Sequence, residues 1–439
     1  MSIFKAYDIR GIYGKDLDEN IVYKIARAYV LKFKPKKVTV GMDGRVSSPS
    51  LFKALLKGIT DQGCCAVDIG LVTTPMMYYS VWNYGYEGGL MVSASHNPKE
   101  YNGVKMVRQE AVPVGGDTGI YEIEKMIEKL PDLPNEKGIV EKKQIMDDYV
   151  RHSLSYGNIT KKFKIVADTA NAVGGPLAHK FFTKLGLKFT HLFAELDGTF
   201  PNHEANPLKD ENLESLKKEV LKQNADIGIA FDGDADRVGF VDEQGNTVTS
   251  DMILALVAEN ILKKTPGKKI LADVRCSRIV PEIVKLNKGI PGRCMVGHSL
   301  VKKYMKEQDA YFAGELSSHF YLKDEHYAEA PFFVILKVLE LMQESGKKLS
   351  ELVLPLKKYF QTGEINSKVD DKEAKMKEFS LKFKDGKQNW MDGLTVEYDD
   401  WWFNVRASNT EPYLRLNLEA NKKKLMKEKR DQILSLIRG

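Results

Sequence analysis

The chain has 439 residues, of which 43% are hydrophobic and 29% are charged. These proportions are ordinary for folded domains and exclude extensive disorder, and a chain of this length has room for about two to four domains. Its 66 basic and 60 acidic residues are mixed along the sequence and give a net charge of +6, which suits an anionic substrate but predicts no nucleic-acid partner.

The sequence also argues against export and against a membrane location. Its N-terminus lacks the long apolar segment of a secretory signal. The most apolar windows, residues 252–262 and 332–342, contain charged residues and are shorter than the roughly 20 residues that a spanning helix needs. Because no CxxC spacing occurs, we expect a cytoplasmic protein with free thiols at Cys64, Cys65, Cys276 and Cys294.

Strands and helices alternate through the first part of the chain. Ser48-Pro49 is a typical helix start and Gly63 a typical helix end. Alternation at this spacing predicts a largely parallel α/β sheet. We expect a first domain over residues 1–148, with strands at 37–42, 64–69 and 88–92 and a second helix at 75–83.

Two further α/β domains are predicted by the same alternation, over residues 149–249 and 250–359. The first of them has expected strands at 164–168 and 225–231. The other begins with Ser250 as a helix cap and continues with a helix at 251–264 and a strand at 269–273.

The pattern changes in the last part of the chain. A charged helix is expected near residues 371–383, followed by strands at 394–398, 402–406 and 413–418 and a basic terminal helix. Consecutive strands with helices at either end predict a small α+β domain over residues 360–439.

The stretch from Val92 to Lys105 is the first candidate site. It follows an apolar run, residues 89–92, that predicts a buried strand, and Asn97-Pro98 then turns the chain out of the sheet. A serine just past a strand end lies where open α/β sheets bind ligands, and it can be a nucleophile or a phosphate carrier. A plain polar loop would also explain this stretch.

The acidic run Asp232, Asp234 and Asp236 is the second candidate site, and it directly follows a predicted strand. In an extended segment these alternate side chains share one face and offer three oxygen ligands to Mg²⁺. A plain solvated acidic loop is one alternative. A calcium-binding EF-hand loop is a weaker one, which rests on Glu243 at the twelfth position. However, Arg237 occupies the sixth position, where that loop requires glycine.

These two motifs, together with Gly314-Glu-Leu-Ser-Ser-His319 and Arg406-Ala-Ser-Asn-Thr-Glu-Pro412, resemble the signatures of the α-D-phosphohexomutases. This is the phosphomannomutase and phosphoglucomutase family. Tyr7-Asp-Ile-Arg-Gly11 and Gly297-His-Ser299 are similar to two further family motifs, so the resemblance covers the whole chain in order. It implies three related α/β domains with mixed sheets and a smaller C-terminal α+β domain around a central cleft.

The resemblance implies an isomerase that interconverts hexose 1- and 6-phosphates, with mannose as the first expected sugar and glucose as the second. Ser95 would carry the phosphoryl group, and a hexose 1,6-bisphosphate would serve as intermediate and activator. One Mg²⁺ per active site would be held by Asp232, Asp234, Asp236 and a phosphoryl oxygen on Ser95. The expected partners are sugar phosphates, in a monomer or homodimer.

Catalytic roles are implied for three further residues. Lys105 is the first candidate for general acid/base catalysis, with a pKa lowered by crowded positive charge, His319 is the second, and Arg10 faces the cleft. The resemblance assigns substrate contacts to Tyr7, His96, Arg237, His298, Glu315, Ser317, Arg406, Ser408, Asn409 and Thr410. The last four of these would bind the distal phosphate.

Three residues depart from the family motifs, and they bear on the alternatives. Ala235 replaces a glycine and is expected to keep an ordinary backbone, whereas Ser318 replaces a glycine and would be strained if its φ is positive. Leu316 stands where glucosamine-specific members usually carry glutamine, which argues against a phosphoglucosamine mutase. A serine-phosphate sugar phosphatase is a further alternative, while a non-catalytic sensor has no need of a phosphorylatable serine.

Overall fold

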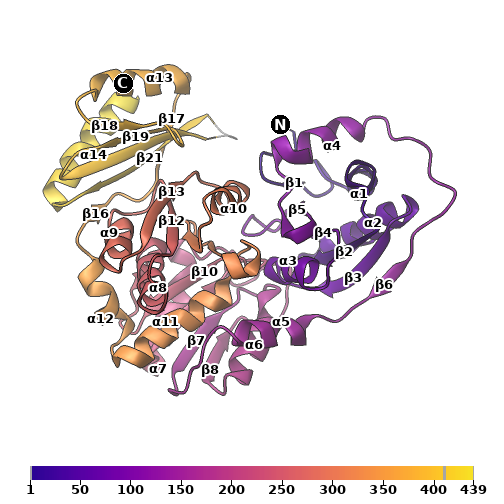
Figure 1. Cartoon of the computed structure of the whole chain (residues 1–439), viewed down its shortest axis with the longest axis horizontal. Helices are drawn as coiled ribbons and strands as arrows, with labels where there is room; N and C mark the ends of the chain where they lie inside the picture. The colour runs from indigo at the N-terminus through magenta and orange to yellow at the C-terminus, as the bar shows by residue number, and fades with distance from the viewer. Residues whose placement is uncertain (1, 409–411, 439) are drawn as a thin grey trace. The chain divides into compact units, whose positions relative to one another are not determined.

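The computed structural model describes residues 2–408 and 412–438. Figure 1 labels the helices and strands of the chain. The described residues form two compact units, and each unit combines two stretches of sequence. The first unit contains Met1–Thr249 and Ser317–Ser350, and the second contains Ser250–Leu316 and Glu351–Gly439.

The first unit begins with a six-stranded mixed sheet in the order β1-β5-β4-β2-β3-β6. Its strands are β1 (Ile9–Ile12), β2 (Lys37–Met42), β3 (Cys65–Leu71), β4 (Gly88–Val92), β5 (Tyr101–Arg108) and β6 (Val140–Lys142). Strands β2, β3, β4 and β6 pair in parallel, whereas β5 pairs antiparallel with both β4 and β1. The predicted strands at 37–42 and 88–92 are confirmed to the residue.

Local sequence signals fix the helices of this domain, which are α1 (Glu19–Phe33), α2 (Ser48–Asp61), α3 (Thr74–Asn83), α4 (Tyr121–Met126) and α5 (Met146–Leu154). Helix α1 begins at the N-cap Asp18, whose carboxylate accepts a hydrogen bond from the Ile21 amide. Helix α3 is capped in the same way by Thr73. Helices α1 and α2 contribute buried residues such as Ile25 and Leu55 to the hydrophobic core.

A second mixed sheet of five strands follows in the order β11-β10-β9-β7-β8. Its strands are β7 (Lys164–Asp168), β8 (Lys188–Leu192), β9 (Ile227–Phe231), β10 (Val238–Asp242) and β11 (Thr247–Val248), with helices α6 (Gly174–Lys184) and α7 (Glu214–Gln223). Strands β7, β8 and β9 are parallel, and β10 returns antiparallel to β9. The tight β9–β10 connection carries the acidic run.

The returning segment of the first unit, residues 317–350, contains β15 (Phe320–Leu322) and α11 (Pro331–Ser345). Phe332 of α11 lies 4.6 Å from Phe181, 5.5 Å from Phe231 and 6.3 Å from Tyr149 between ring centroids. These aromatic contacts bury the N-terminal end of α11 against the second sheet domain. They explain why this segment belongs to the first unit although it lies far along the chain.

The second unit has two sheets. In the first, β12 (Lys269–Asp273) pairs in parallel with β13 (Ile290–Cys294) and β14 (Phe312–Gly314). The accompanying helices are α8 (Ser250–Lys264), α9 (Ile279–Leu286) and α10 (His298–Glu307), and α12 (Leu349–Val353) leads toward the C-terminal part.

The C-terminal sheet is antiparallel, which confirms the predicted α+β character. Its order is β16-β21-β20-β19-β18, with β17 also paired to β21. The strands are β16 (Phe360–Gln361), β17 (Ile365–Lys368), β18 (Lys387–Asn389), β19 (Leu394–Glu397), β20 (Trp401–Ala407) and β21 (Tyr413–Ala420). Helices α13 (Lys372–Lys382) and α14 (Lys423–Arg438) contribute Phe379 and Ile433 to its core.

Candidate active site

Ser95 lies at the end of β4 and points into the first unit, where it is only 2% exposed. Its hydroxyl donates a hydrogen bond to Oδ2 of Asp232 at 2.8 Å and lies 3.1 Å from Nδ1 of His96. Its amide donates to the Ser93 hydroxyl at 2.9 Å. The fold therefore brings together the serine loop and the acidic run, which are 137 residues apart in sequence.

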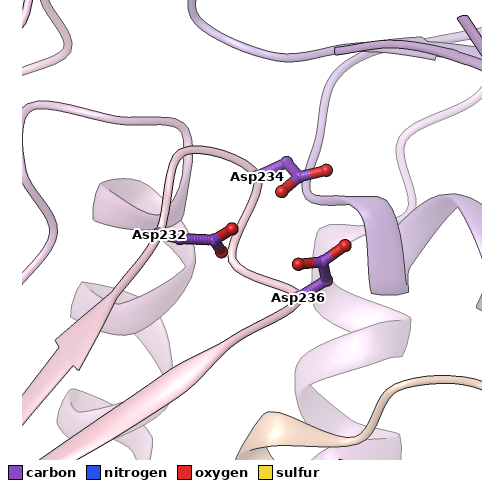
Figure 2. A group of neighbouring side chains, drawn as sticks. All are labelled: Asp232, Asp234 and Asp236. Atoms are coloured by element: carbon purple, nitrogen blue, oxygen red, sulfur yellow. The ribbon is translucent and has the colours of Figure 1, made fainter. Parts of the chain in front are cut away.

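The three aspartates of the acidic run converge at one point (Figure 2). Asp232, Asp234 and Asp236 are buried, and one carboxylate oxygen of each lies within 4.8 Å of the others. Burial raises the pKa of Asp232 well above its ordinary value, and the charges of Asp236 and Asp234 raise it further. A divalent cation would relieve this crowding of negative charge.

A second observation indicates that the acidic run can hold a cation. Oδ1 of Asp234 is buried and has no hydrogen-bond partner among the residues that the structure describes. A buried carboxylate oxygen without a donor is costly unless a positive charge compensates it. Oxygen ligands of this kind are those that Mg²⁺ prefers.

The backbone of the acidic run corrects one expectation. Ala235 does not keep an ordinary backbone, because its φ is 52°, in the left-handed region that favours glycine. Ser318, at φ 65°, is strained as foreseen, and Ser95 itself has φ 51°. Three non-glycine residues of the site are thus held in an unfavourable conformation.

Lys105 on β5 lies among carboxylates rather than among cations. Its Nζ is 2.6 Å from Oδ2 of Asp236 and 3.1 Å from Oδ2 of Asp234. Burial alone would lower the pKa of Lys105, but the two aspartates outweigh burial and raise its pKa well above the ordinary value. The expectation of a pKa lowered by crowded positive charge is therefore wrong for the surroundings that the structure shows.

His319 reaches the acidic run because its backbone bridges Arg237 in an isolated antiparallel pair. Its Nε2 lies 3.1 Å from Oδ1 of Asp236 and 3.3 Å from Nε of Arg237, and its Nδ1 lies 3.1 Å from the Ser317 hydroxyl. Nε2 cannot both donate to the carboxylate and accept from the arginine. The shorter, charge-assisted contact to Asp236 is favoured, and Nδ1 then accepts from Ser317.

The charge state of Asp236 follows from the same contacts. Burial would raise the pKa of Asp236, but the positive charge of Lys105 and the hydrogen bond from His319 outweigh it, so its pKa is lowered well below the ordinary value. Burial lowers the pKa of His96 well below its ordinary value, and the charges of Arg237 and Arg10 add to this effect. His96 is therefore neutral at neutral pH.

Arg10 contacts the serine loop from the N-terminal segment. Arg10, on β1, donates a hydrogen bond from Nη1 to Oδ1 of Asn97 and pairs through Nη2 with Asp8. Tyr7 is half-buried in the turn before β1. The Arg10 contact ties β1 to the loop that carries Ser95.

The sequence interpretation missed Arg45, a residue that holds the serine loop in place. Arg45 is 1% exposed and donates hydrogen bonds at 2.7–3.1 Å to the backbone oxygens of Ser95, Asn97, Pro98 and Tyr101. Its Nε lies 3.2 Å from Oδ2 of Asp43. The signal that could have found it is its place just after β2, at the carboxyl end of a parallel strand.

Glu315 is placed in the second unit, whereas Ser317 and His319 belong to the first. Glu315 is buried and accepts a hydrogen bond from the Gly297 amide at 2.8 Å, just before His298 at the start of α10. Arg275 lies 3.9 Å from this carboxylate and 2.6 Å from that of Asp273.

A group of three arginines in the second unit surrounds Glu364. Its carboxylate lies 2.9 Å from Arg406, 3.2 Å from Arg415 and 3.7 Å from Arg275. Burial would raise the pKa of Glu364, but these arginines outweigh it and lower the pKa. Neither Glu364 nor two of the three arginines was singled out from the sequence.

Arg406 still has a donor to offer, since its buried Nε has no hydrogen-bond partner in the described part of the chain. Arg415 donates from Nη2 to the Ser408 hydroxyl at 3.3 Å. Such a cluster of planar cations suits a phosphate. Asn409 and Thr410 lie outside the described residues.

Comparisons with known proteins give matches along the whole chain. Four domain models of "Phosphoglucomutase/phosphomannomutase" match it in order: alpha/beta/alpha domains I, II and III at residues 1–133, 147–245 and 249–359, and the C-terminal domain at residues 364–436. No helix among the described residues has the length and apolar content that crossing a membrane requires.

Individual relatives agree. A phosphomannomutase of Methanocaldococcus jannaschii is 40% identical over 444 residues, covering 100% of this chain and 98% of the relative. A phosphomannomutase/phosphoglucomutase of Pseudomonas putida is 39% identical over 432 residues, covering 96% and 92%. The crystal structure of a phosphoglucomutase/phosphomannomutase family protein from Burkholderia thailandensis superposes with a TM-score of 0.92 at 35% identity, covering 99% of this chain and 96% of that one.

Proposed function

Because this chain belongs to the phosphoglucomutase/phosphomannomutase family and is an isomerase of that class, we propose that it interconverts mannose 1- and 6-phosphates, with glucose phosphates as second substrates. The observation that carries the proposal is the 2.8 Å hydrogen bond from the Ser95 hydroxyl to Asp232. It puts a hydroxyl that can carry a phosphoryl group directly against a cluster of cation ligands.

Asp232, Asp234 and Asp236, with a phosphoryl oxygen on Ser95, are the residues that would hold one Mg²⁺. When bound, the cation supplies neutralisation of the charge that develops on the phosphoryl oxygens. Arg237, which lies 3.7 Å from Oδ2 of Asp232, adds a fixed positive charge at the same place. Support for this assignment comes from the buried, unpaired Oδ1 of Asp234.

We assign the general acid and base role first to Lys105 and second to His319. Two carboxylates hold Lys105 protonated, so it has a proton to give to a leaving oxygen. Before it can accept a proton, it must first lose this one. The His319 ring is already oriented by Asp236 and Ser317, which places its two nitrogens for proton transfer.

The remaining contacts are proposed by their chemistry. Arg406 and Ser408, with Asn409 and Thr410, would bind the distal phosphate, and the arginine cluster around Glu364 supports that role. Glu315 and Ser317 would bind sugar hydroxyls. The other candidates for substrate contacts are Tyr7, Arg10, His96, Arg237 and His298.

A hexose 1,6-bisphosphate is the proposed intermediate and activator. It would form at Ser95, turn around and return its other phosphate to the same serine, so the distal site has to accept either phosphate. Four domains over residues 1–148, 149–249, 250–359 and 360–439, in a monomer or homodimer, are part of this proposal. Four free thiols support a cytoplasmic location.

Ser95→Ala tests the proposal. We expect the variant to fold normally and to lose steady mutase turnover by at least a thousandfold, because only the phosphoryl carrier is removed. The measurement is a coupled assay with the 1-phosphates of mannose, glucose and glucosamine as separate substrates. Turnover within tenfold of wild type would overturn the serine assignment, a preference for glucosamine would overturn the sugar, and net release of phosphate would favour a phosphatase.

A further inference from the structure

Thr74 contacts the acidic run twice. Its hydroxyl donates a hydrogen bond to Oδ2 of Asp234 at 2.5 Å, and its amide donates to the backbone oxygen of the same residue at 3.0 Å. Thr74 is the first residue of α3 and is fully buried. No motif of the sequence pointed to it, and it lies 160 residues from its partner.

The two oxygens of the Asp234 carboxylate differ in how many hydrogen-bond donors contact them. Oδ2 receives the Thr74 hydroxyl at 2.5 Å, the Ser93 hydroxyl at 3.1 Å and Nζ of Lys105 at 3.1 Å. A carboxylate oxygen has about two lone pairs, so these three donors saturate it. Oδ1 is buried and receives no hydrogen bond among residues 2–408 and 412–438. The protein thus leaves one defined oxygen of Asp234 for a cation.

The amide contact fixes the backbone next to that carboxylate. The first amides of a helix have no partner inside the helix, and α3 uses the amide of Thr74 for the Asp234 oxygen. Ala235, the next residue, has the unfavourable φ of 52°. Such a conformation persists only where neighbours hold it, and the Thr74 amide orients the peptide that joins Asp234 to Ala235. The start of α3 also favours nearby negative charge.

We propose that Thr74 is a positioning residue that presents Oδ1 of Asp234 to the metal as a single-oxygen ligand. The proposal rests on the proposed function, because it requires that the acidic run binds a divalent cation. Thr74 itself touches neither the substrate nor the cation. It acts by occupying Oδ2 and by holding the loop that carries Asp234.

Three variants of the full-length protein separate this role from a general effect on folding. Thr74→Val keeps the shape and removes the hydroxyl, and Thr74→Ser restores a hydroxyl. The matched control is Thr39→Val, since Thr39 is equally buried in the same domain but pairs with the Ser80 hydroxyl at 3.1 Å. If Thr74→Val fails to fold, Thr74→Ala takes its place.

The readout is Mg²⁺ affinity measured by isothermal titration calorimetry. Loss of a residue that orients a metal ligand typically weakens binding by about 10–100-fold, so we expect that loss for Thr74→Val. Thr74→Ser should stay within about threefold of wild type, and Thr39→Val should bind normally. Wild-type affinity in Thr74→Val, or an equal loss in Thr39→Val, would overturn the inference.

The outcomes also distinguish this inference from the proposed function. If Asp234→Asn loses Mg²⁺ binding while Thr74→Val retains it, the positioning role falls and the metal site stands. If Ser95→Ala keeps its turnover, the mutase assignment falls, whereas a selective loss of Mg²⁺ affinity in Thr74→Val would still support the positioning role.

Discussion

At Ala235 the main chain turns through a conformation that costs an L-residue about 1–2 kcal/mol. Its methyl group is buried and packs against its neighbours in the first unit. A glycine would relieve the backbone strain but would lose this packing. The two effects are similar in size, since a buried methylene group is worth about 0.8 kcal/mol.

We therefore predict that Ala235→Gly changes the free energy of unfolding by less than about 1 kcal/mol and preserves activity. Ala235→Val should destabilise the protein by more than about 2 kcal/mol, because a β-branched residue at this φ is a severe outlier. Urea unfolding and a Mg²⁺ titration of both variants check this. If Ala235→Val is as stable as wild type, the backbone at residue 235 is not strained.

His191, on β8, is held neutral by its surroundings. Burial, together with the smaller effect of the neighbouring His179, lowers the pKa of His191 to about 4 from an ordinary 6.5. Nε2 of His191 lies 2.9 Å from the Thr169 hydroxyl, a contact in which the neutral ring can accept. In the unfolded chain the same imidazole takes up its proton near pH 6.5.

Because of His191, the folded protein is expected to lose stability as the pH falls. As pH falls from about 6.5 to about 4, the unfolded state binds a proton that the folded state does not, so stability falls. We predict that His191→Gln loses less stability between pH 7 and pH 5 than wild type does, as measured by urea midpoints. His179→Gln, on the exposed side of α6, removes only the smaller cause and should change the slope little. Equal slopes for His191→Gln and wild type would refute the assignment.

Prediction from the sequence succeeded where a signal is local. A continuous apolar run specified β4, and Ser48-Pro49 specified the start of α2. The sequence did not predict β1 and β5, which pair antiparallel and have no distinctive hydrophobic pattern of their own. The mixed character of the first sheet therefore came from resemblance to a family and not from periodicity.

The same contrast between local signals and long-range contacts applies to the residues of the candidate active site. Ser95 and the three aspartates stand in recognisable motifs, so their types and spacing were readable. Arg45 and Thr74 act through partners that lie 50 and 160 residues away, and neither of them stands in a recognisable motif. The wrong expectation for Lys105 has the same origin, because its neighbours are set by tertiary structure.

At the scale of the whole molecule, Arg278 joins the two sheets of the second unit. It lies at the start of α9 and donates hydrogen bonds to the backbone oxygens of Asp399 at 3.0 Å and Trp401 at 3.1 Å, and also to that of Tyr398. Its amide donates to Glu419 at 3.1 Å. These contacts hold the turn between β19 and β20 against the domain that contains α9.

Arg278→Ala should lower the free energy of unfolding of this unit by about 2 kcal/mol, because several hydrogen bonds from one charged group are lost. We also expect faster hydrogen exchange in residues 398–401, measured by mass spectrometry. Lys358→Ala is the control, since the Lys358 side chain forms an exposed pair with Glu282 at 3.4 Å, and its removal should change stability by less than about 0.5 kcal/mol. If hydrogen exchange in residues 398–401 is unchanged in Arg278→Ala, then Arg278 does not hold the two sheets of this unit together.

The pairing of three arginines with Glu364 affects how tightly this cluster can bind an anion. Arg275, Arg406 and Arg415 already share a carboxylate, so the phosphate proposed to bind there would exchange one negative partner for another. The measured affinity is the difference between two ionic attachments rather than the full strength of either. A ligand held by such an exchange can be released quickly, because the departing anion is replaced at once by a tethered one. Under the proposed phosphate assignment, Glu364 would order the three arginines when no phosphate is bound and would lower the net affinity for one.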